Sequence, residues 1–148
     1  KDFVIDPYQL LDAAARGADA VLLLAAHLDP AQIANLLGEA RDLGLDCLVE
    51  VHEAQELDAA LAAGATLIGI NNRSLHTFEV DLQTSIALLP RIPEDRVAVA
   101  ESGLSRPADL QHLRTTRCDA VLMGEVFMTS ADPAAALALL RAAARGDA

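Results

Sequence analysis

The chain has 148 residues, which is enough for one domain with its own hydrophobic core. Its net charge of −11 argues against nucleic acid and anionic membrane as partners, because both call for a basic surface. Hydrophobic residues make up 53% of the chain and aromatic residues only 3%, so we expect an aliphatic core. No apolar run approaches the roughly 20 residues that a membrane-spanning helix needs.

Six apolar runs predict β-strands. They are unbroken rather than alternating, which is typical of parallel strands that are buried on both faces. In chain order they lie at 3–6, 20–25, 47–51, 67–70, 97–101 and 119–123.

Helix boundaries between these strands are marked by caps and glycines. Aspartate followed by proline predicts the first turn of a helix at Asp6-Pro7, Asp29-Pro30 and Asp132-Pro133. Ser105 is a candidate cap for the helix that contains Pro107. Three glycines stand where the first three helices should end, at Gly17, Gly44 and Gly64.

The regular strand–helix repeat predicts an α/β fold, either a (β/α) barrel or a doubly wound sheet. The sequence shows six βα units and no linker or second domain. A closed barrel needs eight strands and usually at least about 200 residues. We therefore expect that any barrel formed by this chain is incomplete.

Polar residues stand at the ends of four predicted strands. Glu50, Asn71 and Glu101 each end an apolar run, and the pairs Ser102-Gly103 and Gly124-Glu125 follow the last two runs. Because the carboxyl ends of parallel strands meet at one edge, we expect these residues to surround one pocket.

Each of these residues has a structural and a functional interpretation. A carboxylate such as Glu50 is stabilised near the positive end of a helix, and Ser102 can cap one. Alternatively, neighbouring carboxylates perform general acid and base catalysis. Glycine turns at Gly103 and Gly124 can offer backbone amides to a phosphate.

The longest polar connection runs from Asn71 to Val80 and is a candidate for covering a substrate. Asn71 and Asn72 fit either a turn or an amide that orients a hydroxyl or carbonyl group. Arg73 fits either a loop salt bridge or an anchor for the loop or for a substrate carboxylate. Lys1, on pattern alone, fits a surface residue.

Histidines and cysteines give no sign of a metal site. The four histidines lack metal-ligand spacing, and no His/Cys cluster is present. Cys47 and Cys118 lie in or beside predicted buried strands without a C-x-x-C pattern. Free thiols in a reducing cytosol are favoured over a disulfide, so we expect a cytoplasmic protein.

Five segments together resemble the indole-3-glycerol phosphate synthase family. They are K-D-F-V-I-D-P-Y-Q at 1–9, L-V-E-V-H at 48–52, G-I-N-N-R-S-L-x-T-F-E-V-D at 69–81, A-E-S-G at 100–103 and D-A-V-L-M-G-E at 119–125. The resemblance implies a TIM (β/α)8 barrel and a lyase of tryptophan biosynthesis. It also implies cyclisation of 1-(2-carboxyphenylamino)-1-deoxyribulose 5-phosphate to indole glycerol phosphate, with loss of CO2 and water and without metal or cofactor.

The resemblance also implies roles for individual residues. Lys1 matches a catalytic lysine that acts as general acid toward the substrate's ketone oxygen, which reverses its first interpretation. Glu50 matches an acid/base glutamate, and Asn71 and Glu101 match residues of the substrate pocket. The other matches are the phosphate-side positions Ser102, Gly103, Gly124 and Glu125, the loop residue Arg73, and Leu22 beside the anthranilate ring.

The six predicted strands correspond to the family's strands three to eight. We therefore expect a single partial barrel domain over 1–148 that lacks the N-terminal extension and the first two βα units. Such a chain should be catalytically inactive alone, and its open edges should favour self-association or a complementing N-terminal segment. The alternatives are a non-catalytic assembly module or a different phosphate-binding barrel, such as a phosphoribosyl isomerase or a thiazole synthase.

Overall fold

A computed structural model describes residues 3–147 and contains one parallel sheet of five strands. The strands follow one another in chain order across the sheet, and each pairs in parallel with the next. Their bounds are β1 Ala20–Leu24, β2 Asp46–Val51, β3 Leu67–Asn71, β4 Val97–Glu101 and β5 Ala120–Leu122.

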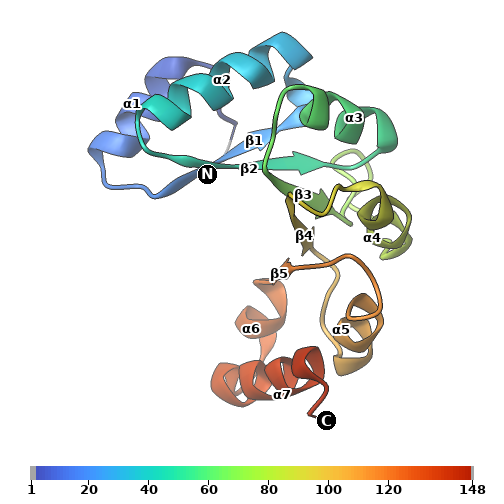
Figure 1. The fold of residues 1–148 in the computed structure, drawn as a ribbon. Coiled ribbons are helices and arrows are strands. Elements are labelled where there is room, and N and C mark those ends of the chain that lie inside the picture. Colours follow the sequence, from blue (N-terminus) through green and yellow to red (C-terminus); the bar gives the residue numbers. More distant parts are fainter. Residues whose placement is uncertain (1–2, 148) are drawn as a thin grey trace.

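Helices connect the strands and follow the outer side of the curved sheet (Figure 1). This arrangement is a partial (β/α) barrel, with α2 to α5 on the connections between successive strands. The α-helices are α1 Pro7–Ala15, α2 Pro30–Asp42, α3 Ala54–Ala62, α4 Gln83–Leu88, α5 Pro107–Leu113, α6 Glu125–Thr129 and α7 Pro133–Arg145. Two short 3₁₀ helices are η1 Ala25–His27 and η2 Leu89–Arg91.

Five of the six predicted strands are confirmed, but the prediction of a strand at 3–6 is wrong. Within the described residues this segment pairs with no strand, and it leads directly into α1. The Gln9 side chain binds its backbone instead, donating to Phe3 O and accepting from Ile5 N and Asp6 N. Backbone groups that a strand would use in a ladder are thus committed to a helix cap.

The aspartate–proline caps are confirmed. Asp6, Asp29 and Asp132 each accept a hydrogen bond from a backbone N–H of the helix that they precede. Ser105 is not the cap of α5, because Arg106 occupies that position and the Asp109 carboxylate binds the backbone N–H groups of both Ser105 and Arg106.

The three glycine stops are also confirmed. Gly17, Gly44 and Gly64 all adopt positive φ just beyond helix ends.

The two faces of the sheet differ in burial. The face toward the helices is fully covered and forms the core, with exposed fractions below 1% at Leu23, Val49, Ile68, Ile70 and Ala98. The opposite, inner face is only partly covered, since Val97 is 45% and Leu122 50% exposed. Strands β1 and β5 are the two edges of this sheet.

Candidate active site

Glu50 and Asn71 meet at the carboxyl ends of neighbouring strands. Glu50 lies on β2 with only 5% of its surface exposed, and Asn71 is the last residue of β3. The Asn71 Nδ2 donates to Glu50 Oε1 at 3.0 Å, while Asn71 Oδ1 accepts from the backbone N–H of Arg73 at 2.9 Å. The amide therefore fixes one carboxylate oxygen and, at the same time, the start of the following loop.

His52 stands between two carboxylates at the same strand end. Its Nε2 lies 3.4 Å from Glu50 Oε1 and its Nδ1 lies 3.4 Å from Glu56 Oε2. The pKa of His52 is raised above its ordinary 6.5, chiefly by the contact with Glu56 and also by Glu50 and Glu101, although burial acts in the opposite direction. The imidazolium form is thereby favoured.

Glu101 is the last residue of β4, and its side chain lies over the neighbouring strand β3. It is 5% exposed, and its carboxylate lies over Gly69, where an added Cβ would overlap Glu101 Oε1. Gly69 is the register partner of Glu50, so this placement brings the Glu101 carboxylate back to the level of Glu50. Leu22 points to the same inner face, one pleat deeper on β1.

Asn72 is a buried structural residue that the sequence-based interpretation did not separate from Asn71. It is 2% exposed, and its Nδ2 donates to Glu101 O and Ser102 O at 2.9 and 3.1 Å. Its Oδ1 accepts from Ser85 N at 3.0 Å, which ties the β3 loop to α4. The only signal in the sequence was an asparagine placed one residue beyond the strand end, on the face opposite to Asn71.

The turn after β4 has an unusual backbone. Ser102 and Gly103 are consecutive residues with positive φ, at 62° and 71°. An added Cβ at Gly103 would overlap Val80 Cγ1, so the absence of a side chain lets the long loop approach this turn. Consecutive residues in this region can turn backbone N–H groups toward an anion.

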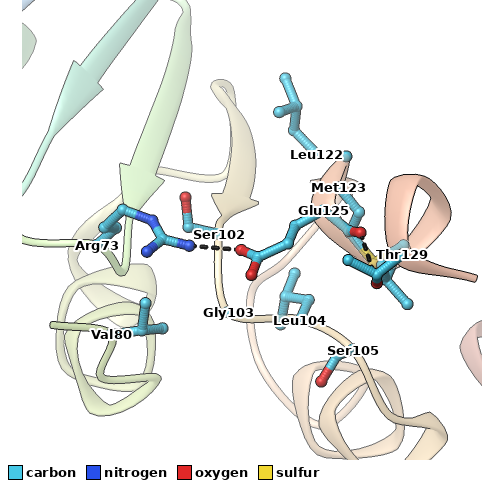
Figure 2. Close-up of a pocket in the computed structure, with 12 residues that line it drawn as sticks. Arg73, Val80, Ser102, Gly103, Leu104, Ser105, Leu122, Met123, Glu125 and Thr129 are labelled. Atoms are coloured by element: carbon cyan, nitrogen blue, oxygen red, sulfur yellow. Dashed lines mark hydrogen bonds and ion pairs between the residues drawn. The ribbon is translucent and has the colours of Figure 1, made fainter. Parts of the chain in front are cut away.

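A cavity of about 500 Å³ opens beside this turn (Figure 2). Across it, Arg73 Nη2 and Glu125 Oε2 form an ion pair of 2.7 Å, and Arg73 Nη1 also donates to Phe78 O. The lining combines the expected phosphate-side residues with loop residues: Arg73, Val80, Ser102, Gly103, Leu104, Ser105, Leu122, Met123, Gly124, Glu125, Val126 and Thr129.

A second cavity of about 500 Å³ lies on the other side of the β3 loop. Asn71, His52 and Glu56 line it, together with His27 of η1. The two cavities flank the segment that begins at Asn71, one at the glycine turns and one at the Glu50–His52 pair.

Lys1, expected as a catalytic residue, lies outside the described residues. Within residues 3–147, no group of three or more His, Cys, Asp or Glu side chains is arranged to hold a metal ion. None of the helices in that range is long and apolar enough to cross a membrane.

Cys47 and Cys118 are free thiols, and burial raises the pKa of Cys47 to about 11.

The family model for indole-3-glycerol phosphate synthase matches residues 1–140. The chain belongs to this family. The indole-3-glycerol phosphate synthase of Bordetella pertussis is 55% identical over 140 residues, which are 95% of this chain and 53% of that protein. The enzyme of Polynucleobacter necessarius is 51% identical over 95% of this chain and 52% of its own length. The chain thus spans about half the length of these curated relatives.

Solved structures of distant proteins share the fold of this indole-3-glycerol phosphate synthase family member. The 3-hexulose-6-phosphate synthase of Salmonella typhimurium superposes with a TM-score of 0.81 at 16% identity, over 98% of this chain and 71% of its own. A KGPDC structure from Streptococcus mutans gives 0.73 at 15% identity, over 96% and 68% of the two chains. At these identities the likeness describes the fold alone.

Proposed function

We propose that this chain provides most of the active site of an indole-3-glycerol phosphate synthase. The reaction would cyclise 1-(2-carboxyphenylamino)-1-deoxyribulose 5-phosphate to indole glycerol phosphate with release of CO2 and water. One observation carries the proposal for a chain of this family: Glu50, Asn71 and Glu101 converge at one sheet edge, next to a cavity bordered by Gly103 and Gly124.

Ring closure, decarboxylation and dehydration require one group that protonates a leaving oxygen and another that accepts a proton. Glu50 is supported as an acid/base group by its burial and by the Asn71 amide, which orients one oxygen. Glu101 would share the substrate pocket, and Lys1 would act as general acid toward the ketone oxygen. Groups held this closely together can divide proton transfers between them.

The phosphate would bind in the cavity at Ser102, Gly103 and Gly124. The positive φ of Ser102 and Gly103 supports this assignment, because such turns direct backbone amides to one side. Arg73 supplies a guanidinium at the cavity wall, currently paired with Glu125. Leu22, on the inner face, would contact the anthranilate ring.

We further propose that the isolated chain is inactive and that its inner face is covered by another segment. Val97 and Leu122 are large apolar side chains about half exposed on that face, and β1 and β5 present open sheet edges. A complementing N-terminal segment or a second copy would cover them. The free Cys47 and Cys118 support a cytoplasmic location.

The test is turnover by a fused enzyme, in which this chain is joined to the part of the Bordetella pertussis relative that it does not match. The fused enzyme should form indole glycerol phosphate, whereas the isolated chain should not. Glu50→Gln and Glu101→Gln should each lower kcat by about 100-fold or more. Glu39→Gln, on the exposed side of α2, is the matched control and should leave kcat unchanged.

A fused enzyme that folds but does not turn over the substrate would contradict the proposed activity. Sedimentation of the isolated chain tests the covering of the inner face separately. A strictly monomeric chain that neither self-associates nor binds the N-terminal part would overturn that second proposal.

A further inference from the structure

His52 has a place in this site that the roles assigned above do not use. It follows the buried Glu50 by two residues, so its side chain projects from the same side of the chain. Its side chain is only 15% exposed, and neither ring nitrogen makes a hydrogen bond of good geometry within the described residues. The ring is instead held electrostatically between Glu50 and Glu56 at 3.4 Å on either side.

Glu56 holds the imidazole from the helix side. Its Oε2 accepts the backbone N–H of His52 at 2.6 Å and also faces His52 Nδ1. The carboxylate lies in the first turn of α3, where the helix end favours negative charge. One carboxylate therefore fixes both the backbone and the ring of His52.

Glu50 receives two contacts on the same oxygen. Asn71 Nδ2 donates to Glu50 Oε1 from β3, and His52 Nε2 approaches that oxygen from the end of β2. A cation placed on one oxygen stabilises the ionised carboxylate and fixes its orientation.

We propose that His52 is a positioning residue for Glu50: held by Glu56, its imidazolium keeps the Glu50 carboxylate oriented for proton transfer. This inference rests on the proposed role of Glu50. It makes a chain of contacts from α3 to the β3 loop, in the order Glu56, His52, Glu50 and Asn71.

The charged groups around His52 come from several elements. Glu50 on β2, Glu56 on α3 and Glu101 on β4 all favour its protonated form, and burial opposes it. The adjoining cavity adds other titratable side chains, namely His27, Glu53, His76, Glu79 and Asp81. The titration of His52 must therefore be measured on the His52 ring itself, separately from the other titratable groups.

The first measurement is an NMR titration of the His52 ring nitrogens in the 148-residue chain. The midpoint of His52 should fall in Glu50→Gln and in Glu56→Gln, because each variant removes one flanking anion. Glu39→Gln is the matched control, since Glu39 is exposed on α2 and does not line the cavity beside His52; it should leave the midpoint unchanged. If Glu50→Gln leaves the midpoint unchanged while Glu56→Gln lowers it, His52 serves only α3 and the proposal is overturned.

The second measurement is the pH dependence of kcat in the fused enzyme. His52→Gln should lower kcat by about 10- to 100-fold, the usual effect of removing a supporting partner, with little change in KM. In wild type, kcat should also fall as the pH rises through the His52 midpoint measured by NMR, because the neutral ring no longer holds the Glu50 carboxylate. His52→Gln should lack this limb of the profile, whereas a variant that merely loosened the fold would retain it.

The outcomes separate the two proposals. A wild-type kcat in His52→Gln, with the His52-dependent limb retained, would overturn the positioning role while leaving the proposed function intact. Full turnover in Glu50→Gln would refute the proposed role of Glu50, even if the titration showed the His52–Glu50 pair. If His52→Gln does not fold, Glu56→Gln provides the test, because it should move the limb to lower pH together with the His52 midpoint.

Discussion

The Glu101 carboxylate occupies the space above Gly69. An added Cβ at Gly69 would overlap Glu101 Oε1 and would lie 3.2 Å from Leu48 Cδ1. A side chain at position 69 would therefore displace the Glu101 carboxylate, which lies across it from the next strand, although the backbone conformation there does not call for glycine. The open space at Gly69 determines where the Glu101 carboxylate lies in the candidate site.

Gly69→Ala should displace Glu101 and reduce kcat of the fused enzyme by about tenfold or more, since a displacement of about 1 Å at a reacting group is costly. Gly38→Ala is the control, because Gly38 lies in α2 with no heavy atom within 4 Å of an added Cβ. It should stabilise the chain by about 0.5–1 kcal/mol through helix propensity. Urea unfolding and kcat of both variants check this; equal kcat values would contradict the role of Gly69.

Gly103→Ala should destabilise the chain by more than Gly64→Ala. Both positions have positive φ, which costs a non-glycine residue about 1–2 kcal/mol. At Gly64 nothing lies within 4 Å of an added Cβ, whereas at Gly103 the Cβ would overlap Val80 Cγ1. Denaturant titrations of the two variants measure the difference. Equal losses in the free energy of unfolding would show that the loop after β3 can move away from residue 103 at no cost in stability.

Asn72→Ala should cost about 2–3 kcal/mol, because it leaves the buried backbone groups of Glu101 and Ser85, and the half-buried carbonyl of Ser102, without their side-chain partner. Asn35→Ala, at an exposed position of α2, should be neutral or slightly stabilising. Hydrogen exchange should also rise in the β3 loop of the Asn72 variant. Unchanged protection there would mean that this side chain does not hold the loop.

Glu125→Gln should tighten binding of inorganic phosphate by roughly two- to fivefold, the range expected for one exposed ion pair. The substitution releases Arg73 and removes a negative charge from the cavity wall. Asp58→Asn is a matched control, because Asp58 forms an ion pair of the same 2.7 Å length with Arg91 outside this cavity. Phosphorus NMR titrations give the dissociation constants; weaker binding in Glu125→Gln would place phosphate elsewhere.

The stabilising effect of the His52–Glu56 pair should depend on pH. The folded-state pKa of His52 is raised, so its contribution is complete below the ordinary 6.5 and is lost as the pH rises through the raised value. The pKa of Glu56 is lowered: burial raises it, but the contacts with His52 lower it more. Its contribution is present above the ordinary 4.5 and is lost as the pH falls through the lowered value.

His52→Gln should therefore cost most stability between pH 4.5 and 6.5 and progressively less at higher pH. Urea unfolding of wild type and variant at several pH values measures this difference. A stability difference that does not change with pH would show that packing of the ring, rather than its charge, is what the variant removes.

Much of the fold was predictable from local patterns. Unbroken apolar runs identified β1 to β5, and aspartate–proline pairs located the starts of α1, α2 and α7, because these signals act within a few residues. For segment 3–6 the prediction of a strand is wrong, because an apolar run does not show whether a partner strand is available. There the Gln9 side chain takes the backbone groups instead.

The sequence by itself determined the family, the succession of β-strands along the chain, and the positions of Glu50, Asn71 and Glu101 at strand ends. Only the tertiary structure decided how these residues meet. The Glu101 carboxylate over Gly69 and the Asn71 amide on Glu50 depend on strand register and on side-chain direction across strands. Those contacts join residues on different strands that lie far apart in the chain, so no local pattern specifies them.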